Sequence, residues 1–288
     1  MFEITPSMSS GGQPSAGGTR VTDTRIITVT SGKGGVGKTT TTANIGVALA
    51  RLGKRVVVID TDIGLRNLDM MLGLQNRIIY DLVDLVEGRC RMQQALIRDR
   101  LLDELYLLPA AQTRGKSAVS PADMVRVCTQ LRGECDYVLV DSPAGIDEGF
   151  RNAVAAADEC LLVATPEANS VRGVDRVLGI LEGKRPLKCS LIINRLRADM
   201  VRRKRSFSPD EMLETLDIDL IGIVPEAEEV LEANALGVPV AHGDESLAAQ
   251  AYHNIARRML GEEVPFLPLL EPVAQRRGLF GFLKKLAG

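Results

Sequence analysis

Residues 31–42 contain the pattern with the most specific chemistry in this sequence. Residues 32–39, GKGGVGKT, fit G-x-x-x-x-G-K-[ST], the pattern of a phosphate-binding loop. The glycines let successive backbone N–H groups converge on phosphate oxygens, and the N-terminus of the following helix adds its positive end. We therefore expect the loop to bind a nucleoside triphosphate through Gly34, Gly35, Val36, Gly37, Lys38, Thr39 and Thr40.

Two side chains of this loop have chemical roles of their own. The Lys38 ammonium would reach the β- and γ-phosphates, and the Thr39 hydroxyl would ligate Mg²⁺. The loop lies between a β-branched run at residues 26–30 and a helical pattern at residues 40–52. A glycine-rich turn could match the pattern by chance, but the strand–loop–helix context indicates a functional loop.

Aspartates follow two other apolar runs. Asp60 and Asp62 follow residues 56–59, and Asp141 follows residues 137–140. Because the carboxyl ends of parallel strands face the ligand crevice of such sheets, we expect these carboxylates near the phosphate loop. Asp141 fits the pattern of a residue that holds Mg²⁺, directly or through water, and Asp60 or Asp62 could orient the attacking water.

A later run leads to a polar residue that could contact a nucleobase. Asn194 follows the apolar residues 191–193. Its amide offers both a donor and an acceptor, which suits a purine edge. Asn is also common in turns, so the residue type leaves both interpretations open.

Apolar runs alternate with helical patterns over most of the chain. Short strands are predicted at residues 26–30, 56–59, 105–108, 137–140, 160–164, 187–193 and 220–224. Helices are predicted between most of them, for example at 40–52, 120–131, 171–181 and 209–216. This alternation predicts an α/β fold of the P-loop NTPase type, a single doubly wound, mostly parallel sheet with helices on both faces.

The chain divides into four predicted parts. Residues 1–24 are rich in Gly, Ser, Thr and Pro and are expected to be a disordered extension. The P-loop domain is expected at residues 25–262, followed by a Pro-broken linker at 263–275 and an amphipathic helix at 276–288.

The predicted C-terminal helix carries one apolar stripe. Four side chains have the i, i+3, i+4, i+7 spacing of a helix face: Leu279, Phe282, Leu283 and Leu286. With the cations beside it, this composition is typical of a helix that lies in a membrane interface. A helix docked on the protein's own core or on a partner is the alternative, and the prolines before it favour a detached segment. The membrane-binding residues would be Leu279, Phe280, Phe282, Leu283, Lys284, Lys285 and Leu286.

Composition narrows the function classes. The formal net charge is −2, so no global basic field points to nucleic acid, and we do not expect a nucleic-acid partner. The cations in residues 195–205 are interpreted first as a solvated surface and second as a surface for a partner or nucleic acid. The five cysteines form no C-x-x-C pair, which favours reduced thiols. No apolar run reaches the ~18 residues of a membrane-spanning helix.

Several longer motifs occur in a familiar order. They are SGKGGVGKTT, DTDIGLRNLDMMLG, LPAAQTRGK, DSPAGI, INR and VPE. With the tail, they resemble the MinD family of septum-site-determining ATPases, a branch of the deviant Walker A (ParA/MinD) P-loop proteins. The resemblance implies an ATP-dependent homodimer in which Lys33 reaches the partner's phosphates, Lys38 acts in its own site and Asp62 orients water. It also implies that Asn194 and Pro225 contact adenine.

The same resemblance implies a cycle at the cytoplasmic face of the cell membrane. The ATP-bound dimer would bind anionic lipids through the tail, recruit the division inhibitor MinC, and be released when MinE stimulates hydrolysis. The N-terminal extension departs from most of the family. Three alternatives stay open: a ParA-type DNA-partition ATPase that uses the basic run, a flagellar-number regulator with the same tail, and an iron–sulfur reductase.

Overall fold

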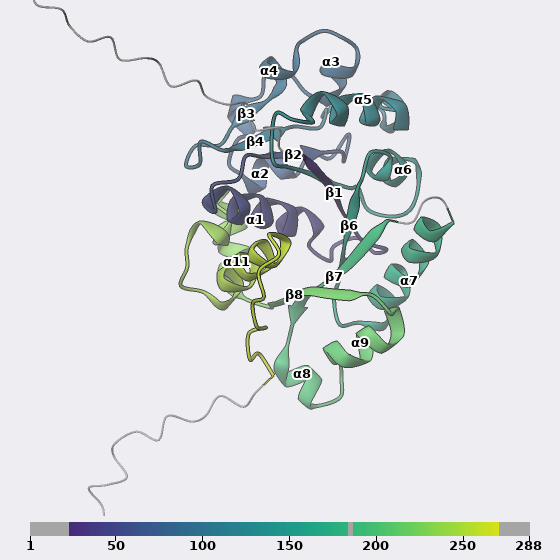
Figure 1. Ribbon diagram of the computed structural model, residues 1–288, viewed down its shortest axis with the longest axis vertical. Coiled ribbons are helices and arrows are strands. Elements are labelled where there is room, and N and C mark those ends of the chain that lie inside the picture. The colour runs from purple at the N-terminus through teal and green to yellow at the C-terminus, as the bar shows by residue number, and fades with distance from the viewer. Residues whose placement is uncertain (1–22, 184–186, 271–288) are drawn as a thin grey trace, which may run out of the picture.

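A computed structural model describes residues 23–183 and 187–270. It contains the strands β1 (Arg25–Thr30), β2 (Val56–Asp60), β3 (Ile97–Arg98), β4 (Leu105–Leu108), β5 (Tyr137–Asp141), β6 (Glu159–Ala164), β7 (Lys188–Leu196) and β8 (Asp219–Pro225). They form one sheet in the order β3-β4-β2-β5-β1-β6-β7-β8 (Figure 1). Every described pairing is parallel except that of β3 with β4. The predicted α/β fold with a single, mostly parallel sheet is therefore confirmed.

Helices cover both faces of this sheet. They are α1 (Lys38–Arg51), α2 (Leu68–Met71), α3 (Leu82–Val86), α4 (Met92–Ala95), α5 (Pro121–Leu131), α6 (Glu148–Val154), α7 (Ala168–Glu182), α8 (Ala198–Arg202), α9 (Pro209–Leu216), α10 (Glu228–Leu236) and α11 (Leu247–Met259), with 3₁₀ turns η1 (Gln75–Arg77), η2 (Lys116–Ala118) and η3 (Val240–His242). On one face, α1 and α11 pack against alternate strand side chains such as Ile27 and Val58. On the other face, α5, α6, α7 and α9 cover the intervening side chains such as Ile26 and Leu162. Because both faces are buried, the central residues of most strands are apolar.

The local sequence explains where the predicted helices begin. Ser120 precedes Pro121 at the start of α5, and the Asp123 N–H donates to its hydroxyl at 3.2 Å. Ser208 and Glu211 repeat this arrangement at α9, with an N–H···Oγ distance of 3.2 Å. A capping Ser, a Pro in the first turn and an acid three residues after the Ser stabilise the first turn. The predicted bounds of α9 and β4 are those of the structure.

Strand β7 is longer than the sequence predicts. We expected it to end at residue 193, but it continues to Leu196, where pairing with β8 resumes at Pro225. The register shifts between Ile193 and Leu196, and Arg195 has a φ of 56°. Asn194 therefore lies inside an irregular strand end, where such a bulge redirects side chains, and not after the strand.

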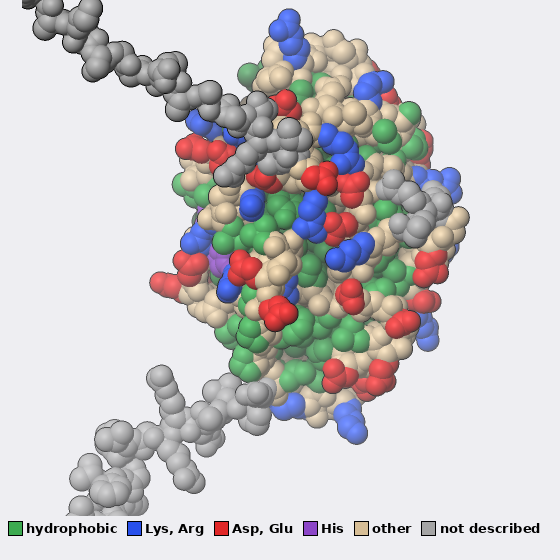
Figure 2. Space-filling view, in the orientation of Figure 1, with side chains coloured by type: hydrophobic (Ala, Val, Ile, Leu, Met, Phe, Trp, Pro, Cys, Tyr) green, Lys and Arg blue, Asp and Glu red, His purple; other side chains and the backbone are tan. Residues whose placement is uncertain are grey.

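The described part of the predicted linker, residues 263–270, lies against the domain. Arg258 of α11 donates to the carbonyl oxygens of Val264 and Pro265, both at 2.9 Å. Its guanidinium carbon lies 4.1 Å from the centroid of the Phe266 ring. Figure 2 shows hydrophobic side chains gathered on the lower part of the face it presents, near the end of the described chain.

The two predicted terminal parts lie mostly outside the described residues. These are residues 1–22 of the N-terminal extension and residues 276–288 of the tail. Thr24, the last residue of the predicted extension, is buried and donates its hydroxyl to the Cys135 carbonyl oxygen at 2.6 Å. Within residues 23–183 and 187–270, no helix combines the length and apolar character needed to cross a membrane.

Candidate functional site

The centre of the site is the N-terminus of α1, which follows the glycine-rich loop. Gly37 precedes this helix with a φ of 95°, and no side chain caps the first turn. The first helical hydrogen bond runs from the Thr41 N–H to the Gly37 oxygen at 2.9 Å. The N–H groups before Thr41 therefore have no partner within the helix and can bind an anion. A Cβ at Gly37 would lie 2.4 Å from Asn194 Nδ2, so this position accepts only glycine.

Lys38 occupies the first turn of α1 and is only 7% exposed. Burial lowers the pKa of its ammonium, while the charges of Asp141 and Asp62 oppose that shift. The structure therefore brings together three residues that the sequence predicted at separate strand ends and in the loop. A buried ammonium in the first turn of the helix is positioned to contact a phosphate placed at the helix end.

Asp141, the last residue of β5, lies beside the same turn of α1. Its Oδ2 accepts from the Thr39 hydroxyl at 2.7 Å, and its Oδ1 accepts from the Thr42 hydroxyl at 3.0 Å. Burial raises the pKa of Asp141 to about 7, the charge of Asp60 adds to this rise, and the Thr39 hydrogen bond opposes it. Oxygen atoms from a carboxylate and a hydroxyl fit the preference of Mg²⁺. Our sequence reasoning missed Thr42, although its i+3 spacing from Thr39 signals a shared helix face.

Asp60 organises the loop that follows β2. Its carboxylate accepts the N–H of Asp62 at 2.9 Å and the N–H groups of Asn67 and Leu68, both at 3.1 Å. Burial raises the pKa of Asp60 to about 6, and these three N–H groups oppose the rise. Because the Asp60 carboxylate accepts N–H groups from both ends of residues 62–68, it fixes the backbone position of Asp62.

An ion pair within the same loop adds to these hydrogen bonds. Arg66 has a φ of 47°, and its Nε lies 2.9 Å from Oδ2 of Asp69, which is 1% exposed. A guanidinium beside a buried carboxylate compensates its charge. The motif DIGLRNLD therefore encodes a loop held by backbone hydrogen bonds and an ion pair, and the charge of its first residue, Asp62, acts on Lys38.

Lys33 extends from the loop to a glutamate of the same chain. Its Nζ lies 2.9 Å from Oε2 of Glu167, and both side chains are substantially exposed. Glu167 precedes α7, three residues after the end of β6. Glu167 was not predicted from the sequence, although an apolar strand ends three residues before it. An exposed pair of this kind is weak, so Lys33 can leave it readily.

The loop also touches the helix that Glu167 precedes. Gly32 faces Gly173 of α7, and a Cβ at Gly32 would lie 1.9 Å from the Gly173 oxygen. Neither residue can carry a side chain without moving the other segment. The phosphate loop and α7 are therefore in direct backbone contact.

A pocket of about 300 Å³ adjoins the loop at its open side. The loop residues that line it include Lys33, Gly34, Gly35 and Val36. The β7 and β8 ends contribute Arg195, Arg197 and Glu226. Pro225, which we expected at the adenine, is the last residue of β8 and does not line this pocket.

The Asn194 side chain is hydrogen-bonded to the backbone of the phosphate loop. Its Nδ2 donates to the Val36 oxygen at 2.8 Å, and it is only 5% exposed. Thr40, on the next turn, accepts from Asn234 Nδ2 of α10 at 3.3 Å. One N–H of the Asn194 amide is used in the bond to Val36, which leaves its second N–H and its oxygen for a ligand.

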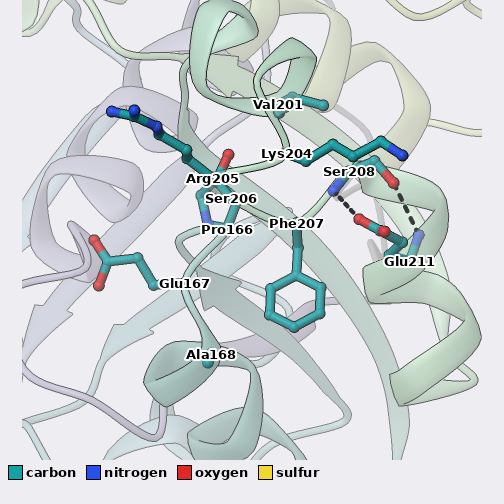
Figure 3. A pocket seen from close by; sticks show the side chains of 10 residues that line it. All are labelled: Pro166, Glu167, Ala168, Val201, Lys204, Arg205, Ser206, Phe207, Ser208 and Glu211. Atoms are coloured by element: carbon teal, nitrogen blue, oxygen red, sulfur yellow. Dashed lines mark hydrogen bonds between the residues drawn. The ribbon is translucent and has the colours of Figure 1, made fainter.

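A larger cavity of about 640 Å³ lies next to this pocket (Figure 3). The two share Pro166, Glu167, Arg205 and Ser206. The Phe207 N–H donates to the Pro166 oxygen at 3.1 Å, which holds the α8–α9 connection against the strand end. Figure 3 shows Glu167 and Arg205 extending to the same side of the view.

Two predictions concern other parts of the chain. The membrane-binding residues Leu279 to Leu286 lie outside the described residues. The cysteines are free thiols, and burial raises the pKa of Cys128 and Cys135 to about 12, so these two are unreactive. Among residues 23–183 and 187–270, no group of three His, Cys, Asp or Glu side chains could hold a metal ion.

The open end of α1, set at the carboxyl edge of a parallel sheet, makes this chain a P-loop nucleoside triphosphatase. The AAA domain family matches residues 24–187. The chain is 50% identical over 264 residues to the septum site-determining protein MinD of Bacillus subtilis, with 91% of this chain and 97% of that protein covered. It therefore belongs to the MinD family of septum-site-determining ATPases.

Solved structures agree with this assignment. A chain of the MinC:MinD cell division protein complex of Aquifex aeolicus is 44% identical with a TM-score of 0.78, covering 84% of this chain and 98% of that one. MinD of Pyrococcus horikoshii, solved with Mg-ADP, is 31% identical with a TM-score of 0.75, covering 82% of this chain and 96% of that one.

Proposed function

We propose that this chain, an ATPase that uses ATP and Mg²⁺, is a membrane switch that positions the division septum. It dimerises with ATP, binds the cytoplasmic face of the cell membrane through residues 276–288, and recruits MinC. MinE-stimulated hydrolysis then releases it. The observation that carries the proposal is the loop that combines a buried Lys38 with an exposed Lys33. The MinC:MinD complex of the Aquifex relatives supports MinC as a partner.

The first step is nucleotide binding by the loop. The N–H groups of residues 34–40 and the Lys38 ammonium hold the phosphates at the end of α1. Thr39 and Asp141, whose oxygen atoms lie 2.7 Å apart, would hold Mg²⁺, which neutralises phosphate charge when bound. Asn194 would contact adenine with the amide atoms that Val36 leaves free, and Pro225 would pack near the base.

Hydrolysis needs a positioned water and a completed site. Asp62 orients the attacking water, and Asp60 holds Asp62 in place through its N–H at 2.9 Å. Lys33 leaves Glu167 and reaches the phosphates of the partner subunit. Each site is then complete only in the dimer, so dimerisation and catalysis become one event.

The tail makes membrane binding depend on this dimer. Each cation near an anionic surface contributes ~1 kcal/mol, and each partly buried apolar side chain contributes ~1–2 kcal/mol. Ordering the tail costs ~1 kcal/mol or more per residue, which removes most of this gain. One tail should therefore bind marginally, whereas two tails on one dimer gain avidity of ~10²–10⁴.

Sedimentation with anionic vesicles tests the proposal. The full chain is compared with a chain ending at Gln275, each with ATP and with ADP. We expect ATP to drive pelleting of the full chain only, and Lys33→Ala to abolish it by preventing dimerisation. Pelleting that ignores the nucleotide, or that survives truncation, would overturn the membrane switch while leaving the ATPase assignment intact.

A further inference from the structure

An apolar groove lies on the far side of α7 from the phosphate loop. It has a volume of about 610 Å³ and is formed by α7, α9 and the first residues of β7 and β8. Its walls are the aliphatic side chains Leu178, Leu181, Leu187, Leu213, Ile218 and Leu220. Leu178 and Leu181 form the buried floor, while the other four are half-buried. A groove of this size and character suits the apolar face of a short helix.

The rim of the groove is acidic. Glu182, Asp217 and Asp219 line it and are exposed, and the described lining residues include no Lys or Arg. The groove therefore favours an occupant that is apolar on one side and cationic beside it.

The described chain ends on the same hydrophobic cluster that forms the groove. Leu269 and Leu270 pack against the cluster to which Leu178 and Leu181 belong. Five residues separate Leu270 from Arg276, and an extended chain between these two residues spans at most about 20 Å. Residues 276–288 thus follow a segment that contacts the hydrophobic cluster to which the groove belongs.

The sequence of residues 276–288 matches what the groove requires. It reads RRGLFGFLKKLAG, with five large apolar side chains, four cations and no acid. We propose that in the monomer this segment docks its apolar stripe into the groove, with its cations on the acidic rim. The inference rests on the proposed function, because the docked stripe is the surface that would otherwise enter the membrane.

Docking makes the groove and the membrane competitors for one face of the tail. A single tail that is docked most of the time loses membrane affinity in proportion to its docked fraction. Two tails on an ATP-bound dimer gain avidity that a single groove contact does not match. The groove therefore weakens membrane binding by monomers, and the avidity of two linked tails is needed to overcome it.

Cys189 provides a natural probe of the groove. It lines the groove, is half-buried, and its thiol pKa is lowered by a hydrogen bond with Cys160. The measurement is the alkylation rate of Cys189 by a maleimide, followed by peptide mass spectrometry, with ADP and without lipid. We expect the full chain to react roughly 3- to 10-fold more slowly than the chain ending at Gln275.

Rim variants connect this protection to the charges. Glu182→Lys with Asp219→Lys should restore the fast rate in the full chain and increase its pelleting with ADP. Glu214→Lys, a matched change on the exposed face of α9 outside the groove, should keep Cys189 protected. Both substituted sites are exposed, so the fold should tolerate the changes.

Two outcomes would overturn the docking. Equal Cys189 rates in the full and truncated chains would show that the tail does not cover the groove. Protection that rises with protein concentration would assign the groove to the tail of a second copy. Because these rates are measured without lipid, they stand apart from the vesicle experiment, which alone tests the proposed membrane switch.

Discussion

Replacing Asp141 by Asn should stabilise the protein at alkaline pH while removing a proposed ligand of Mg²⁺. Burial raises the pKa of Asp141 from 3.8 to about 7, so ionisation opposes folding. The unfolded chain loses this proton first, and stability therefore falls as the pH rises from about 4 to about 7, then stays low. The full shift corresponds to about 4 kcal/mol. Disturbing the hydrogen bonds from Thr39 and Thr42 costs about 1 kcal/mol each, which leaves about 2 kcal/mol.

Thermal unfolding at pH 8 and pH 5, without nucleotide, measures this effect. For a domain of this size, about 2 kcal/mol corresponds to a rise in Tm of about 4–8 °C at pH 8, and the rise should shrink at pH 5. Asp103→Asn is the control, because the Asp103 side chain is 86% exposed and should leave Tm unchanged. Adding Mg²⁺ with ATP should stabilise the unchanged protein more than the variant. A Tm that falls equally at both pH values would refute the reasoning.

Three further changes probe the loop and its neighbours. Asp60→Asn should slow hydrolysis roughly 10- to 100-fold with little loss of ATP binding, because the Asp62 loop loses its anchor; steady-state kinetics with direct binding tests this, and unchanged turnover would contradict it. Gly32→Ala should lower Tm and weaken nucleotide binding, because the alanine Cβ would lie 1.9 Å from the Gly173 oxygen. A variant with full activity would disprove the contact. Glu167→Gln should favour the ATP-bound dimer by about 1.5- to 5-fold in sedimentation equilibrium, as expected from freeing Lys33 from an exposed ion pair worth ~0.2–1 kcal/mol.

The parts of the site that lie close together in sequence were the ones that the sequence predicted. Residues 31–40 define the loop by spacing alone, and each strand followed by an acid predicted an edge position. The sequence could not predict which strands are neighbours, because pairing depends on long-range packing. The register of β2 with β5 sets Asp60 directly opposite Asp141, and the charge of Asp60 contributes to the raised pKa of Asp141.

Contacts that need two distant segments were missed for the same reason. Glu167 and Gly173 belong to one helix start that only the folded sheet brings to the loop. Asn194 was predicted at a strand end for adenine, but an irregular β7 directs part of its amide to Val36. No range was predicted for α10 or α11; α10 has no buried residue, and half-exposed helices give a weak apolar pattern.

The contact between Gly32 and Gly173 has a mechanical consequence. Side chains absorb small displacements by rotating, but two backbones in contact have no such freedom. A force on the outer surface of α7 would therefore pass to the phosphate loop with little loss, and phosphate in the loop would push back on the helix. A displacement of α7 is thus transmitted to the nucleotide site. A protein that binds the outer surface of this helix could therefore respond to the phosphates, or change how they are bound, without entering the site.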